Sequence, residues 1–128
     1  MLMATDLFAM LPRLELTPTA VNVLAVMVGK QQPGGAVPVT QAEIAEELDI
    51  LPSVVSRAMA LLSDRGLVIR PGRGHRYSLN PAIAGYASEQ EMGTTLGRAV
   101  INGTLPPIKV PNYQKRPPKK SGRLAPVA

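Results

Sequence analysis

Two serines and an arginine recur at helical spacing between residues 52 and 64. Ser56 and Arg57 lie three and four positions after Ser53, so a helix would place them on or near one face. Hydroxyl groups are short enough to let a helix approach a surface closely, and an arginine can donate to guanine or to a phosphate. The pattern therefore favours hydrogen bonding to a polyanion, and the base edges of the DNA major groove are matching acceptors.

These residues also predict an amphipathic helix with defined ends. Pro52 suits the first helical position, because its missing N–H would be unpaired there in any case. Gly66 is the expected end, since glycine readily adopts the left-handed conformation that closes many helices. Ala60 and Asp64 extend the exposed face. The predicted buried face consists of Val55, Ala58, Met59 and Leu62.

A second short helix is predicted just before this one. Thr40 and Glu43 have the spacing of a capping box, which predicts that the helix begins at Gln41. Its inward positions are Ile44, Ala45 and Leu48, and its glutamates stay exposed. Two short helices joined by a tight turn form a helix-turn-helix.

A basic β-hairpin is predicted to follow the helix-turn-helix. Residues 67–69 and 76–79 are rich in strand-forming side chains, and residues 71–75 contain the proline and glycines of a turn. Such a hairpin can meet phosphates or enter a minor groove. Its arginines are Arg70, Arg73 and Arg76.

On these residues the chain resembles the winged-helix DNA-binding superfamily. The run Val55-Ser56-Arg57, Leu62 and the run from Arg65 to Val68 look like the recognition helix and first wing strand of MarR-type transcriptional regulators. The segment from Tyr77 to Pro81 is similar to the segment after the wing in RepL-type plasmid replication proteins. The resemblance implies double-stranded DNA as the partner.

Three groups of residues are therefore expected to contact DNA. In the helix-turn-helix they are Gln41, Pro52, Ser53, Val54, Ser56 and Arg57. In the wing they are Arg70, Arg73, His75 and Arg76. In the C-terminal tail they are Lys115, Arg116, Lys119 and Lys120. His75 is the single histidine, and in a turn it fits a phosphate donor or an inert surface group better than a catalyst.

Further elements are predicted on the N-terminal side. Apolar residues between positions 4 and 16 predict a short helix that packs on the core or on a second subunit. Thr17 and Pro18 open another helix, which Gly29 is expected to close. One apolar stripe of that helix comprises Val21, Leu24, Ala25 and Val28. Residues 36–39 predict an edge strand of a three-stranded wing sheet, where proline is tolerated.

A last helix is predicted from Ser88 to about Asn102. Ser88 and Glu91 have capping-box spacing. The apolar face comprises Met92, Leu96, Ala99 and Val100. This helix could cover the core or, with the apolar N-terminal helices, form a homodimer interface.

Charge divides the chain into two parts. Residues 1–102 carry eight basic and nine acidic side chains, whereas residues 103–128 carry six basic side chains, no acidic one and six prolines. Proline prevents helix propagation and the few apolar residues cannot offset ordering entropy, so we expect a disordered basic tail. The overall expectation is a mainly α fold: a winged helix-turn-helix with a three-helix core, a small β-hairpin wing and flanking helices over residues 1–102, and a flexible tail over 103–128.

Other classes of protein have little support. The chain has no cysteine, no secretory leader pattern and no run of about 18 apolar residues, so we expect a soluble cytoplasmic protein. No nucleotide-binding glycine motif or isolated carboxylate pair is present, so neither an enzyme nor a cofactor or metal site is expected. The leading hypothesis is a DNA-binding regulator, a repressor acting by occlusion as a homodimer. The alternatives are a plasmid or phage replication factor and a protein-interaction adaptor that docks through its tail.

Overall fold

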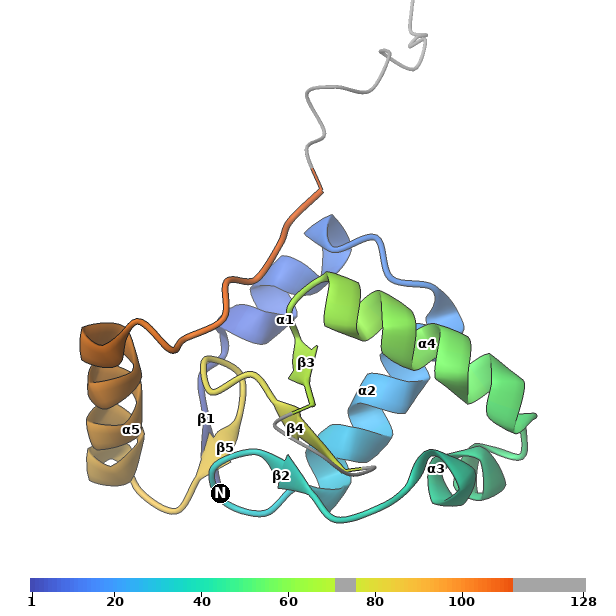
Figure 1. Ribbon diagram of the computed structural model, residues 1–128, viewed down its shortest axis with the longest axis horizontal. Coiled ribbons are helices and arrows are strands. Elements are labelled where there is room, and N and C mark those ends of the chain that lie inside the picture. Colours follow the sequence, from blue (N-terminus) through green and yellow to red (C-terminus); the bar gives the residue numbers. More distant parts are fainter. Residues whose placement is uncertain (71–75, 112–128) are drawn as a thin grey trace, which may run out of the picture.

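The computed structural model describes residues 1–70 and 76–111, and Figure 1 shows helices arranged around two small sheets. The helices are α1 (Asp6–Met10), the 3-10 helix η1 (Leu11–Arg13), α2 (Pro18–Lys30), α3 (Gln41–Leu48), α4 (Pro52–Asp64) and α5 (Glu89–Asn102). The strands are β1 (Leu2–Met3), β2 (Ala36–Val37), β3 (Val68–Ile69), β4 (Tyr77–Leu79) and β5 (Gly85–Tyr86).

The predicted helix-turn-helix is present with the predicted boundaries. Thr40 and Glu43 form a complete capping box: the Thr40 N–H donates to Glu43 Oε1 at 2.9 Å, and the Glu43 N–H donates to Thr40 Oγ1 at 3.2 Å. The left-handed Asp49 (φ 55°) ends α3 and turns the chain toward Pro52, where α4 begins. Leu51 occupies the N-cap without a side-chain hydrogen bond, so proline at the first position sets the start of α4.

The predicted faces of α4 are also confirmed. Its buried residues are Val55, Ala58, Met59 and Leu62. Ser53, Ser56 and Arg57 are exposed, and Val54 is half-buried on the flank. Gly66 follows the helix at φ +77°, and a Cβ at this position would collide with the carbonyl group of Pro107. Both the backbone conformation and the close approach therefore require glycine.

A three-stranded antiparallel sheet forms the wing. Its strand order is β2-β4-β3, so β2 is the predicted edge strand, although it covers only Ala36–Val37 and ends before Pro38. Val37 is paired with Tyr77, and Ile69 with Ser78. The buried side chains of Val37, Val68, Tyr77 and Leu79 anchor the sheet on the helical core.

A second sheet, β1 paired with β5, was not predicted. Leu2 is paired with Tyr86 and Met3 with Gly85, which ties the N-terminus to the segment after the wing. Gln31 fastens this sheet to the end of α2, because its Oε1 accepts from the Gly85 N–H at 2.7 Å. Both strands are too short to show alternation, and the turn signal that identified the wing strands does not join them, so sequence patterns did not reveal this sheet. In Figure 1, α5 lies on the far side of these strands from α3 and α4.

Two expectations about α2 need correction. Helix α2 continues past Gly29 to Lys30. Of the stripe described in the sequence, Leu24 is buried, and the other buried residues of α2 are Ala20, Val23 and Met27. Because α2 is apolar on most sides, its sequence did not define which side packs against α4. Phe8 in α1 is 65% exposed, so this member of the apolar N-terminal segment does not pack on the core.

At the other end of the chain, α5 differs from its prediction in two ways. The Ser88 side chain accepts from the Glu91 N–H at 3.1 Å, but the reciprocal bond of a capping box is not among the contacts of the described residues. Of the predicted apolar face, Ala99 is buried and Met92 and Leu96 are half-buried, whereas Val100 is 64% exposed.

The start of the predicted flexible tail contacts the domain. The side-chain amide of Asn80 donates to the Pro106 carbonyl at 2.9 Å, and the Lys109 N–H donates to the Arg65 carbonyl at 2.8 Å. These contacts place residues 106–109 on the domain, so the expected boundary at residue 102 lies too early in the chain. Residues 112–128 lie outside the described part.

Candidate nucleic-acid interface

The outer face of α4 is a polar surface that faces solvent. Ser53, Ser56 and Arg57 are all exposed, and Pro52 lies exposed at the start of the same helix. Within the described part of the chain, no ion pair holds the Arg57 guanidinium. These exposed hydroxyls and the Arg57 guanidinium are therefore available to an external ligand.

A shallow hollow of about 230 Å³ lies beside Arg57, where α4 meets the start of α2. Thr17 and Thr19 line it together with Val54 and Arg57. Thr17 is the N-cap of α2, and its hydroxyl accepts from the Ala20 N–H at 3.1 Å. Sequence reasoning missed these threonines as neighbours of Arg57, because 38 residues separate Thr19 from it along the chain.

The base of the wing joins three polar side chains. The Tyr77 hydroxyl accepts a hydrogen bond from the Gln41 side-chain amide at 2.7 Å and another from Arg70 Nη2. The Arg70 guanidinium also lies over the Tyr77 ring, 4.7 Å from its centroid. The structure thus brings the predicted residues Gln41 and Arg70 together through Tyr77, a residue that sequence reasoning did not select.

Other predicted DNA contacts are distributed as follows. Arg76 is exposed directly before β4. Arg73 and His75 lie outside the described residues. The four tail residues, Lys115, Arg116, Lys119 and Lys120, lie outside them as well.

Arg65, which follows α4, has an internal role. Its Nε donates to the Leu14 carbonyl at 2.7 Å, and its Nη1 pairs with Asp64 Oδ2 at 2.7 Å. The Arg65 side chain is only 17% exposed. It therefore ties the end of α4 to the segment before α2 and is not available to a ligand.

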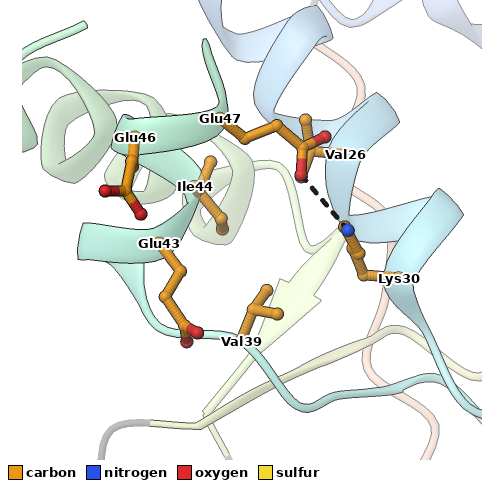
Figure 2. Close-up of a pocket in the computed structure, with 7 residues that line it drawn as sticks. All are labelled: Val26, Lys30, Val39, Glu43, Ile44, Glu46 and Glu47. Carbon is orange, nitrogen blue, oxygen red and sulfur yellow. Dashed lines mark ion pairs between the residues drawn. The ribbon is translucent and has the colours of Figure 1, made fainter. Parts of the chain in front are cut away.

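Acidic side chains gather around a groove between α2 and α3. Figure 2 shows this pocket of about 370 Å³, where Lys30 pairs with Glu47 at 3.3 Å and Glu43 and Glu46 lie along the rim. None of the residues that line it belongs to α4 or to the wing sheet. Carboxylates repel phosphates, so this surface disfavours DNA.

Three helices, a tight turn and a three-stranded wing sheet define a winged-helix domain. Residues 14–76, about half of the chain, match the family model of the MarR family. The chain thus carries a MarR-family winged-helix domain, and the match supports a winged-helix transcriptional regulator. Comparisons with curated proteins and with solved structures gave no match.

Two further observations concern the described residues only. They contain no cluster of three or more histidine, aspartate or glutamate side chains that could hold a metal ion. No helix among them is long and apolar enough to cross a membrane.

Proposed function

We propose that this protein is a sequence-specific regulator of transcription that binds double-stranded DNA. The observation that carries the proposal is the exposed face of α4, where Ser53, Ser56 and Arg57 face solvent beside a wing that presents Arg70 and Arg76. The MarR family match over residues 14–76 supports the same function.

In this proposal α4 enters the major groove and the wing meets the adjacent backbone or minor groove. Ser53 and Ser56 allow close approach, and Arg57 donates to a guanine edge or clamps a phosphate. Bound protein would exclude polymerase from the occupied site, so we propose repression by occlusion.

We further propose that the regulator acts as a homodimer. Proteins of the MarR family are usually dimers. Three large apolar side chains are exposed on α1 and α5: Phe8 (65%), Val100 (64%) and Ile101 (85%). A second copy would cover surface that soluble proteins generally hide. Sedimentation equilibrium tests this: a dimer mass at micromolar concentration supports the proposal, and a monomer mass with binding to single half-sites contradicts it.

Selection from random duplexes tests the proposed function itself. Affinity for the selected sequence and for a scrambled duplex is then measured over a range of salt concentrations. A specific regulator should bind the selected sequence at least about 10³-fold more tightly, with log affinity falling linearly with log salt. Failure to enrich any sequence would contradict the proposal.

A further inference from the structure

A hollow of about 400 Å³ lies between the outer face of α4 and the wing. Helix α4 contributes Ser56 and Ser63 to its wall, the wing contributes Arg70 and Tyr77, and the start of α3 contributes Gln41. Met59 and Ala60 complete the lining. Arg70 is the one charged residue among these lining residues, so the hollow is positive. We call it the wing hollow.

The hydrogen bonds of Tyr77 determine what kind of ligand the hollow accepts. A tyrosine hydroxyl can accept two hydrogen bonds and donate one. Gln41 and Arg70 both donate to this oxygen, so its accepting capacity is used. The hydroxyl proton remains to be donated, and Arg70 retains further N–H groups. The hollow therefore presents donors, and its complementary ligand is a hydrogen-bond acceptor with negative charge.

Position identifies the source of that acceptor. If α4 lies in a major groove and the wing meets the adjacent minor groove, the sugar-phosphate backbone that separates the two grooves must cross the space between them. The wing hollow occupies that space, because α4 forms one wall and the wing forms the other. Small side chains on the α4 wall, Ser56 and Ala60, leave room for a backbone to approach.

We propose that the wing hollow seats one backbone phosphate of bound DNA. The Tyr77 hydroxyl and the Arg70 guanidinium donate to the phosphate oxygens, and Gln41 is a positioning residue that orients the Tyr77 hydroxyl. A cation–π contact with the Tyr77 ring positions Arg70, because the guanidinium carbon lies 4.7 Å from the ring centroid. This proposal rests on the proposed DNA binding and adds a contact that fixes register without reading sequence.

Replacement of Tyr77 by phenylalanine tests the proposed phosphate contact, and the same replacement at Tyr86 serves as its control. Tyr77→Phe removes the donor but keeps the ring, and it should weaken binding to selected and scrambled duplexes alike by about tenfold. Tyr86→Phe is the matched control, because the Tyr86 hydroxyl donates internally to the Pro81 carbonyl at 2.7 Å, away from the hollow. It should leave DNA affinity unchanged. Equal DNA affinity for Tyr77→Phe and wild type would overturn the proposed phosphate contact in the wing hollow.

A phosphate-neutral duplex tests the same contact from the DNA side, and its first measurement uses the wild-type protein. Methylphosphonate is placed at each backbone position of the selected site in turn. At one position in each half-site the modification should weaken wild-type binding markedly more than it weakens binding of Arg70→Ala, which has already lost one of the two donors to that phosphate. If every position affected both proteins equally, or if only free inorganic phosphate bound the hollow, the seat would be wrong. Wild-type selectivity for the selected duplex would still support the proposed function, so the two failures are distinguishable.

Discussion

The outer face of α4 and the loop after β4 use polar side chains in opposite ways. Asn80 in that loop is fully buried, and its amide donates to the carbonyls of Gly66 at 2.8 Å and Pro106 at 2.9 Å. Its Oδ1 accepts from the Ala82 N–H at 2.9 Å. On α4, Ser56 and Arg57 face solvent instead. Polar groups of the loop hold the fold together, whereas those of α4 are available for a ligand.

This contrast separates two experimental readouts. Changes in the loop should lower the free energy of unfolding, and changes on α4 should lower affinity for DNA. Each variant below is therefore measured for both quantities, and the comparison fails if the two readouts move together.

The largest effect is expected at Asn80. Asn80→Ala leaves two carbonyls and one N–H without their partner in a buried site, so the free energy of unfolding should fall by about 3 kcal/mol. Asn22→Ala is the control, because Asn22 is exposed on α2 and should change stability by less than about 0.5 kcal/mol. Denaturant unfolding measures both. Equal stability of the two variants would show that the hydrogen bonds of the Asn80 side chain do not stabilise the fold.

Arg57 should give the next largest effect, and only on DNA binding. Arg57→Ala should weaken binding to the selected duplex by about 1 to 3 kcal/mol with unchanged unfolding, because its side chain is not part of the core. Arg98→Ala, at an exposed position of α5, controls for loss of one positive charge. Fluorescence anisotropy titration measures both variants. An Arg57→Ala protein that binds as tightly as wild type would remove α4 from the interface.

Truncation of the tail tests whether its charges act without sequence preference. The cut belongs after Pro111, because residues 106–109 contact the domain and should be kept. The cut removes five basic residues, Lys115, Arg116, Lys119, Lys120 and Arg123. Their loss should lower affinity for selected and random duplexes by similar factors of up to roughly tenfold at low salt. Thermal stability should not change. Unaltered DNA binding with loss of activity in cells would instead favour a tail that docks on a protein partner.

The smallest effect is expected at alkaline pH. Burial raises the pKa of the Tyr86 phenol above its ordinary value, and the nearby negative charge of Glu91 raises the pKa further. The folded protein thus favours the neutral phenol. This contribution to stability is complete below about pH 10, the ordinary tyrosine pKa, and is lost as the pH rises through the raised value. Tyr86→Phe should flatten the decline of unfolding free energy above pH 10 and leave DNA affinity at neutral pH unchanged. An identical decline in both proteins would contradict this.

The sequence predicted the elements whose signals are local. The Thr40 and Glu43 capping box, Pro52 at the start of α4 and Gly66 after it act through neighbouring residues, and all three are confirmed. Apolar spacing likewise identified the buried face of α4, because that helix has only one apolar side.

Contacts between distant segments could not be predicted in this way. The pairing of Leu2 with Tyr86 and the bond from Asn80 to Pro106 join residues that share no local pattern. The same limit applied to the candidate interface. Gln41 and Arg70 were selected individually, but Tyr77 looked like an ordinary strand residue until the fold placed it between them.

The most direct test of the account maps the DNA-bound surface by NMR. Amide shifts of the full chain are compared before and after addition of the selected duplex. The largest changes should fall on α4 near Ser53, Ser56 and Arg57 and on the wing near Arg70 and Tyr77, while residues around the acidic groove, such as Lys30 and Glu47, stay unchanged. Changes centred on the groove or on α5, with α4 unaffected, would contradict the assignment of α4 and the wing as the DNA-binding surface.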